Sequence, residues 1–211
     1  LNLARVLMET GRTAEALAQL DNAAEHDPES GVVHRLRARA LAGLGRDDEA
    51  AGEYREAIRI DERDAWSMNN LALLLIGQER FEEALPALAR AVQIDSSVAV
   101  FWNNLGMALE RTGHMRAAED AYGSALLADK GYDKAYANLA RVEQVAEQPG
   151  TAPVDLVDLA HRFAEEIERW QVAGIDTAFA APDTAGAVGG DSPAIGIAGL
   201  ILPDTTRAGN R

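Results

Sequence analysis

The sequence predicts an all-α fold made of repeated helical hairpins, and three observations lead to this prediction. Two columns of alanine recur every 34 residues: Ala16, Ala50, Ala84 and Ala118, then Ala23, Ala57, Ala91 and Ala125. Within each unit, apolar residues recur at spacings of three and four on both sides of a central turn, as they do on amphipathic helices. The apolar fraction is 47% but aromatic residues are only 5%, so alanine and leucine dominate, which favours helices over β-sandwich cores.

Composition excludes several classes of protein. The 211 residues include no cysteine, which rules out disulfides, thiolate metal sites and a thiol nucleophile. A net charge of -14 would repel nucleic acid and anionic membrane surfaces, and no apolar run reaches the 18 residues of a membrane span, so we expect neither partner. The chain begins without methionine, which suggests that the original N-terminus and any targeting segment are missing. The compartment stays unknown, with the cytoplasm slightly favoured.

The elements of one repeat are clearest in the unit that begins at Ala99. Its first helix carries apolar residues up to Leu109, and a turn centred on Gly113 follows. The second helix places Ala118 and Ala125 on one face, two turns apart, where small side chains let helix axes approach closely.

A glycine column marks the turn inside each hairpin. Gly11, Gly45 and Gly113 keep the 34-residue spacing and supply the backbone freedom with which the first helix ends. Glu79 interrupts this column, and we expect Gly77 to take over the role in that repeat.

These columns resemble the tetratricopeptide repeat. The resemblance rests on a first large position (Met68, Trp102 and Tyr136, with His34 as a packing residue), a small position (Ala4, Ala38, Ala72, Gly106 and Ala140), a late aromatic or leucine position (Leu20, Tyr54, Leu88 and Tyr122) and the terminal Pro28. It covers residues 1–147, about four units and a fifth first-helix from Asp133 to about Glu147. It implies a right-handed α-solenoid whose concave face, lined by the first helices, binds proteins.

Two further segments follow the repeats. Residues 148–172 contain a turn-rich stretch and an amphipathic helix from Asp155 to Trp170, which we expect to cap the last apolar face of the solenoid. Residues 173–211 are rich in glycine, alanine and proline, which predicts a flexible tail. The apolar stretch 194–202 within the tail is either a loosely packed part of it or a docking strand.

The resemblance places a column of asparagines on the concave face: Asn2, Asn70, Asn104 and Asn138, with Leu36 as the exception. Two interpretations are equally supported. The amides could grip the backbone of an extended peptide, or they could hydrogen-bond locally between adjacent first helices.

Neighbouring columns give the rest of the candidate peptide-binding site. Its basic members are Arg35, Arg39, Lys134 and Arg141, with Arg5 in the same line, and its apolar members are Trp66, Leu73 and Met107, with Ile76 beside them. Such a groove suits a peptide with an apolar middle and acidic ends. Alternatively, the arginines pair with acidic residues of adjacent helices.

The sequence shows no catalytic or metal-ligand motif, so we expect no enzyme activity and no cofactor. The predicted function is a non-catalytic scaffold, bacterial in its composition, that binds a peptide or protein segment. One alternative is the regulatory or substrate-recruiting arm of a larger enzyme or assembly complex with further domains upstream. Another is self-association through the helix at 155–170.

Overall fold

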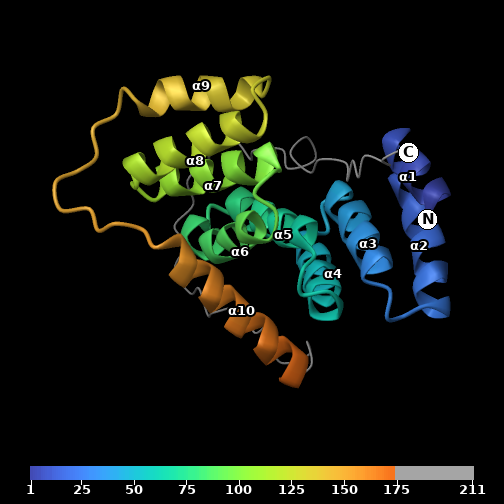
Figure 1. Cartoon of the computed structure of the whole chain (residues 1–211). Coiled ribbons are helices and arrows are strands. Elements are labelled where there is room, and N and C mark those ends of the chain that lie inside the picture. Colours follow the sequence, from blue (N-terminus) through green and yellow to red (C-terminus); the bar gives the residue numbers. More distant parts are fainter. Residues whose placement is uncertain (174–211) are drawn as a thin grey trace, which may run out of the picture.

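The computed structural model describes residues 1–173, which form ten α-helices and no β-strand (Figure 1). The helices are α1 (Asn2–Glu9), α2 (Thr13–His26), α3 (Gly31–Gly43), α4 (Asp47–Ile60), α5 (Ala65–Gly77), α6 (Phe81–Ile94), α7 (Ala99–Arg111), α8 (Met115–Ala128), α9 (Asp133–Val142) and α10 (Leu156–Ala173). The predicted tail, with its apolar stretch 194–202, lies outside the described residues from residue 174 onward.

The first eight helices form four helical hairpins that stack on one another, and α9 adds the first helix of a fifth repeat (Figure 1). Each second helix also packs against the first helix of the following hairpin. The alanines of the first column are completely buried in all four hairpins, where their small side chains permit close helix packing. The predicted all-α solenoid is therefore confirmed.

The turn inside each hairpin needs one residue in the left-handed backbone region. Gly11, Gly45 and Gly113 supply it, with φ angles of 77°, 73° and 87°. In the third repeat Glu79 itself adopts φ 59°, and Gly77 is simply the last residue of α5, so the expected substitution by Gly77 is wrong. Backbone hydrogen bonds of the turn place the left-handed residue two positions after the end of each first helix, whichever residue type stands there.

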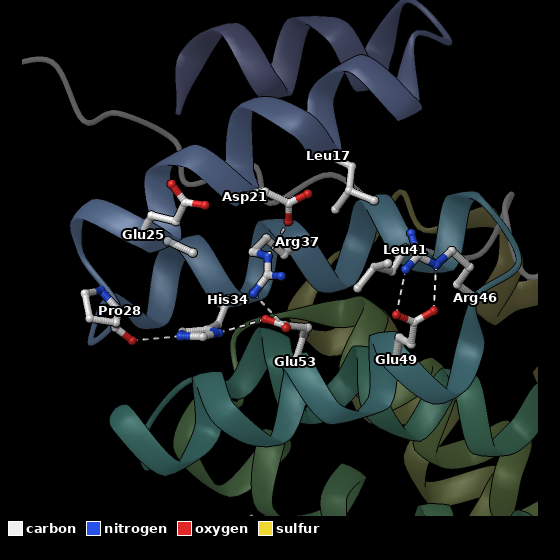
Figure 2. A pocket seen from close by; sticks show the side chains of 11 residues that line it. Leu17, Asp21, Glu25, Pro28, His34, Arg37, Leu41, Arg46, Glu49 and Glu53 are labelled. Atoms are coloured by element: carbon white, nitrogen blue, oxygen red, sulfur yellow. Dashed lines mark hydrogen bonds and ion pairs between the residues drawn. The ribbon is translucent and has the colours of Figure 1, made fainter.

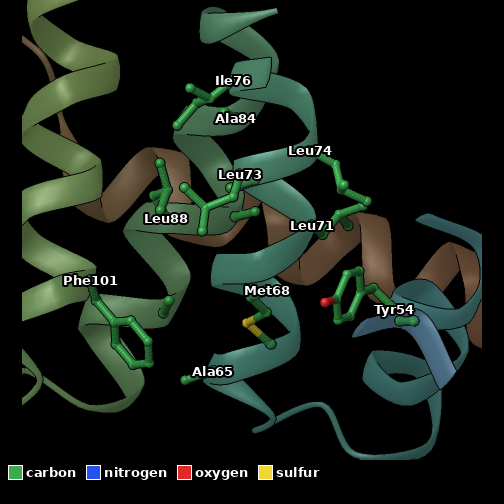
Figure 3. Close-up of a cluster of buried hydrophobic side chains, with 14 of the residues drawn as sticks. Tyr54, Ala65, Met68, Leu71, Leu73, Leu74, Ile76, Ala84, Leu88 and Phe101 are labelled. Carbon is green, nitrogen blue, oxygen red and sulfur yellow. The ribbon is translucent and has the colours of Figure 1, made fainter. Parts of the chain in front are cut away.

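The hydrophobic core is continuous through the stack and is densest around α5 (Figure 3). Met68 and Leu73 of α5 lie between Tyr54 of α4 on one side and Leu88 of α6 and Phe101 of α7 on the other. All five side chains are at most 1% exposed. None of the described helices is long and apolar enough to cross a membrane.

The fifth repeat departs from the expected pattern. The first helix α9 ends at Val142, five residues before the predicted end, and no helix occurs between there and Leu156. The amphipathic helix forms as predicted, but it does not cap α9. It turns back and packs on the outward side of α6, with further contacts to α4 (Figure 1).

The position of α10 follows from the outward face of α6. Leu85, Ala89 and Val92 recur at spacings of three and four along α6 and are all at most 6% exposed, and α10 packs against this helix. One repeat later the equivalent positions of α8 hold Glu119, Gly123 and Leu126, which offer less apolar surface. The apolar side of α10, formed by Ala160, Phe163, Ile167 and Trp170, therefore buries more area against α6.

Candidate functional site

An open cavity of about 270 Å³ lies between the first helices α7 and α9. Its lining comprises Val100, Asn103, Asn104 and Met107 of α7, Tyr132 in the preceding turn, and Lys134, Ala137 and Asn138 of α9. Four of the predicted binding residues therefore meet at one place: Asn104, Met107, Lys134 and Asn138. The wall combines apolar side chains with amide groups and one ammonium group, which is the usual composition of a small binding site.

The asparagines form a chain of hydrogen bonds across adjacent first helices. The side-chain amide of Asn138 donates to Asn103 at 2.9 Å, and that of Asn104 donates to Asn69 at 2.9 Å. Asn69 in turn donates to Asn70 at 3.1 Å. Because these amides are satisfied mainly by one another, they fix the spacing of α5, α7 and α9.

Asn69 and Asn103 are the members of this network that sequence reasoning missed. Each directly precedes a predicted asparagine, so the chain carries two Asn-Asn pairs spaced by 34 residues. This second asparagine column was the signal in the sequence that could have identified Asn69 and Asn103. Asn104 and Asn138 each donate to the first asparagine of the pair on the neighbouring first helix, which explains why two columns are needed for one network.

Two of the predicted basic residues pair with acidic groups of adjacent elements. Arg35 of α3 lies 2.8 Å from the carboxylate of Asp64, which is buried in the turn before α5. Asp64 also accepts hydrogen bonds from the backbone N–H and the hydroxyl of Ser67, so it caps the N-terminus of α5. Arg35 therefore ties α3 to the start of the next hairpin.

Arg141 of α9 makes the corresponding link to α7. Its guanidinium donates two hydrogen bonds to Glu110, at 3.0 and 2.5 Å, and the hydroxyl of Tyr122 donates to the same carboxylate at 2.9 Å. Burial raises the pKa of Glu110, but the hydrogen bonds from Arg141 and Tyr122 outweigh this effect and leave it below its ordinary value. Arg141 also donates to Asn138 at 3.1 Å, so the ion pair and the asparagine chain are continuous.

The other predicted residues lie in earlier repeats and do not line this cavity. Leu73 is 1% exposed and belongs to the core, and Asn70 is likewise buried. Trp66 is half-buried and makes an edge-to-face contact with Phe101 at a centroid distance of 4.9 Å. Arg39 is half-buried on α3. The apolar centre of the predicted groove is therefore largely covered, and the open part lies at α7 and α9.

No group of three or more histidine, aspartate or glutamate side chains with metal-binding geometry occurs in residues 1–173. The side chains around the cavity offer hydrogen bonds, one positive charge and apolar contacts, which suit binding.

Comparison with known proteins agrees with the repeat. Three family models described as tetratricopeptide repeat match residues 1–65, 65–94 and 99–132. No curated protein matched the chain by sequence.

Solved structures share the fold. MamA (residues 41 to the end) from Desulfovibrio magneticus RS-1 is 21% identical, with a TM-score of 0.63 over 81% of this chain and 94% of that one. PilF of Pseudomonas aeruginosa is 24% identical, with a TM-score of 0.61 over 82% and 86%. YrrB, described as a TPR protein with an unusual peptide-binding site, is 22% identical, with a TM-score of 0.59 over 80% and 89%. With the repeat columns, the stacked hairpins and the three matched segments, the chain belongs to the tetratricopeptide repeat family.

Proposed function

We propose that this protein is an interaction scaffold that binds an extended segment of a partner protein along its first helices, with the α7/α9 cavity as the anchoring point. Tetratricopeptide repeat proteins are generally non-catalytic interaction scaffolds. The observation that carries the proposal is the cavity of about 270 Å³ in which four of the predicted binding residues meet. A stack of helices holds this cavity open before the ligand arrives, which lowers the ordering cost of binding.

The lining indicates what the anchor would be. Val100, Met107 and Ala137 form an apolar wall that suits one aliphatic side chain of the ligand. An asparagine amide carries two N–H donors, and the hydrogen bond from Asn138 to Asn103 uses one of them. The second donor can bind a backbone carbonyl of the extended ligand.

Among the predicted basic residues, we expect one to bind an acidic group of the ligand. Arg35 and Arg141 already pair with Asp64 and Glu110, so their charges are largely compensated. Lys134 is exposed at the rim of the cavity and is the basic residue best placed to meet a carboxylate of the ligand. We therefore expect one acidic residue beside the apolar anchor rather than acidic groups at both ends.

The test uses peptides selected from a random displayed library on the wild-type protein. A glutamate at exposed Ala137 would fill the cavity mouth with a charged side chain, and Ala137→Glu should weaken the selected peptides at least tenfold in titration calorimetry. Ala140→Glu is the matched control, because Ala140 is also exposed on α9 but does not line the cavity. Lys134→Glu should weaken only peptides that contain an acidic residue.

Equal affinity of the wild type and Ala137→Glu would contradict the proposal. Asn104→Ala is a poorer test because Asn104 is 3% exposed and holds α7 to α5, so a loss of binding could report a loss of structure.

A further inference from the structure

A second cavity, of about 640 Å³, lies on the opposite side of the first helices, between the second helices α2 and α4 with α3 as its floor (Figure 2). Leu17 of α2 and Leu41 of α3 stand at one end of it, and Pro28 and His34 at the other. The concave-face proposal uses none of these residues.

The 34-residue repeat indicates what kind of ligand such a groove binds. The equivalent groove one repeat later lies between α4 and α6, and it is the one into which α10 packs. Arg55, Arg59 and Glu83 occupy the positions of the cavity residues Asp21, Glu25 and Glu49, whereas apolar Met68, Leu71 and Ala87 stand where the open groove has His34, Arg37 and Glu53. The protein therefore contains its own example of an amphipathic helix seated between two adjacent second helices.

The contacts of α10 show how that groove recognises its helix. Arg55 lies over the ring of Trp170, 5.9 Å from its centroid, and Gln171 donates to the backbone carbonyl of Arg59 at 3.4 Å. Glu166 of α10 also interacts electrostatically with Arg55. Arg55 thus presents positive charge to Glu166 and Trp170 of α10.

Two positions of the open groove carry the opposite charge. Where the occupied groove has Arg55 and Arg59, the α2/α4 groove has Asp21 and Glu25, and both are exposed. Its lining holds the carboxylates of Asp21, Glu25, Glu49 and Glu53 against the guanidiniums of Arg37 and Arg46, so two negative charges are in excess when His34 is neutral.

Part of this charge is already engaged. Asp21 lies 3.0 Å from Arg37, and Arg37 also pairs with Glu53 at 2.8 Å. These ion pairs hold the floor of the groove in place, while Glu25 stands at its rim (Figure 2). Glu25 of α2 is therefore the carboxylate at the rim that a ligand would meet first.

We propose that the α2/α4 groove is a second binding surface, which takes an amphipathic helix of a partner protein with lysine or arginine in the position where α10 carries Glu166. The helical form of the ligand follows from α10 in the equivalent groove, and its basic character follows from Asp21 in place of Arg55, with exposed Glu25 one turn further along α2.

The experiment uses two synthetic peptides as probes. One has the sequence of residues 156–173, and the other is the same peptide with Glu165, Glu166 and Glu168 replaced by lysine. Both keep the apolar side that α10 buries. Titration calorimetry gives the affinity for the intact chain, and NMR chemical-shift mapping locates the bound peptide.

The lysine peptide should bind at least tenfold more tightly than the unmodified one, with shifts confined to α2, α3 and α4. The double variant Asp21→Arg/Glu25→Arg should reverse this order, and Glu25→Arg alone should weaken the lysine peptide. Glu119→Arg is the matched control, because Glu119 is an exposed acidic residue of α8 outside the groove, and it should leave both affinities unchanged. Circular dichroism confirms that each variant is folded.

The proposal would be overturned by no binding of the lysine peptide, by equal affinity of the two peptides, or by shifts centred on α6 that show displacement of α10. An unaltered affinity in folded Asp21→Arg/Glu25→Arg would do the same. Because Ala137 lies on α9, away from this groove, the Ala137→Glu variant tests the concave-face proposal independently.

Discussion

Replacing Gly106 of α7 by alanine adds a single methyl group, and in an ordinary helix this change stabilises by about 1 kcal/mol. The tetratricopeptide column accepts either residue, and alanine stands at the equivalent position in the other repeats. The structure predicts the opposite effect. A Cβ atom at residue 106 would lie 2.6 and 2.7 Å from two ring carbons of Tyr122, and the ring is completely buried.

The magnitude depends on what holds this ring. The hydroxyl of Tyr122 donates to Glu110 at 2.9 Å, so the ring cannot move aside without losing a hydrogen bond to a charged group, which is worth about 1.5–3 kcal/mol. In the second repeat Ala38 coexists with Tyr54, but there Ala42 replaces the glutamate. Subtracting the helix-propensity gain of about 1 kcal/mol, we expect Gly106→Ala to destabilise by about 0.5–2 kcal/mol.

Urea unfolding followed by circular dichroism measures this in a double-mutant cycle with Tyr122→Leu. Leucine is the natural partner of alanine in the third repeat, where Ala72 and Leu88 stand at these positions. In the Tyr122→Leu background, Gly106→Ala should therefore stabilise by about 1 kcal/mol. A stabilising Gly106→Ala in the wild-type background, or the same effect in both backgrounds, would refute the steric argument.

Three other predictions follow from single contacts. Glu79→Gly should stabilise by about 0.5–1 kcal/mol, because a left-handed backbone costs a non-glycine residue about 1–2 kcal/mol and glycine gives part of this back in the unfolded chain; a lower urea midpoint would contradict it. The hydrogen bond of His34 to Glu53, at 2.7 Å, raises the pKa of His34 above 6.5, so its stabilisation is complete below pH 6.5 and is lost as pH rises through the raised value. Unfolding midpoints across pH should show this loss in the wild type, and His34→Met should remove it; an unchanged slope would show that another group is responsible. Trp170→Ala should cost about 3–5 kcal/mol locally and release α10 while α1 to α9 stay folded, because α10 contacts only α6 and α4 extensively among the described helices. Hydrogen exchange should accelerate in α10 alone, and equal acceleration in α6 would indicate one cooperative unit instead.

The sequence was most informative where structure depends on near neighbours. The 34-residue alanine columns located the hairpins, and Gly11, Gly45 and Gly113 located their turns, because helix packing and backbone conformation follow local residue types. Four of the ten predicted binding residues meet at the α7/α9 cavity for the same reason, since equal steps along the repeat give equal positions on the stack. The hydrogen-bond and ion-pair partners of the arginines and asparagines depend on distances between adjacent repeats, and the repeat pattern of the sequence does not give these distances.

By itself, the sequence determined the helices, their pairing into hairpins and their family, because each of these follows from a period that neighbouring residues impose. Only the tertiary structure decided the place of α10, which had the outward faces of α6 and α8 available to it. Leu85, Ala89 and Val92 gave α6 the larger apolar area, and Arg55 met Trp170 there. The free energy of hydrophobic burial depends on the area and shape of the surfaces that meet. A helix distant in sequence, such as α10, can therefore be placed only when the stacked hairpins are known in three dimensions.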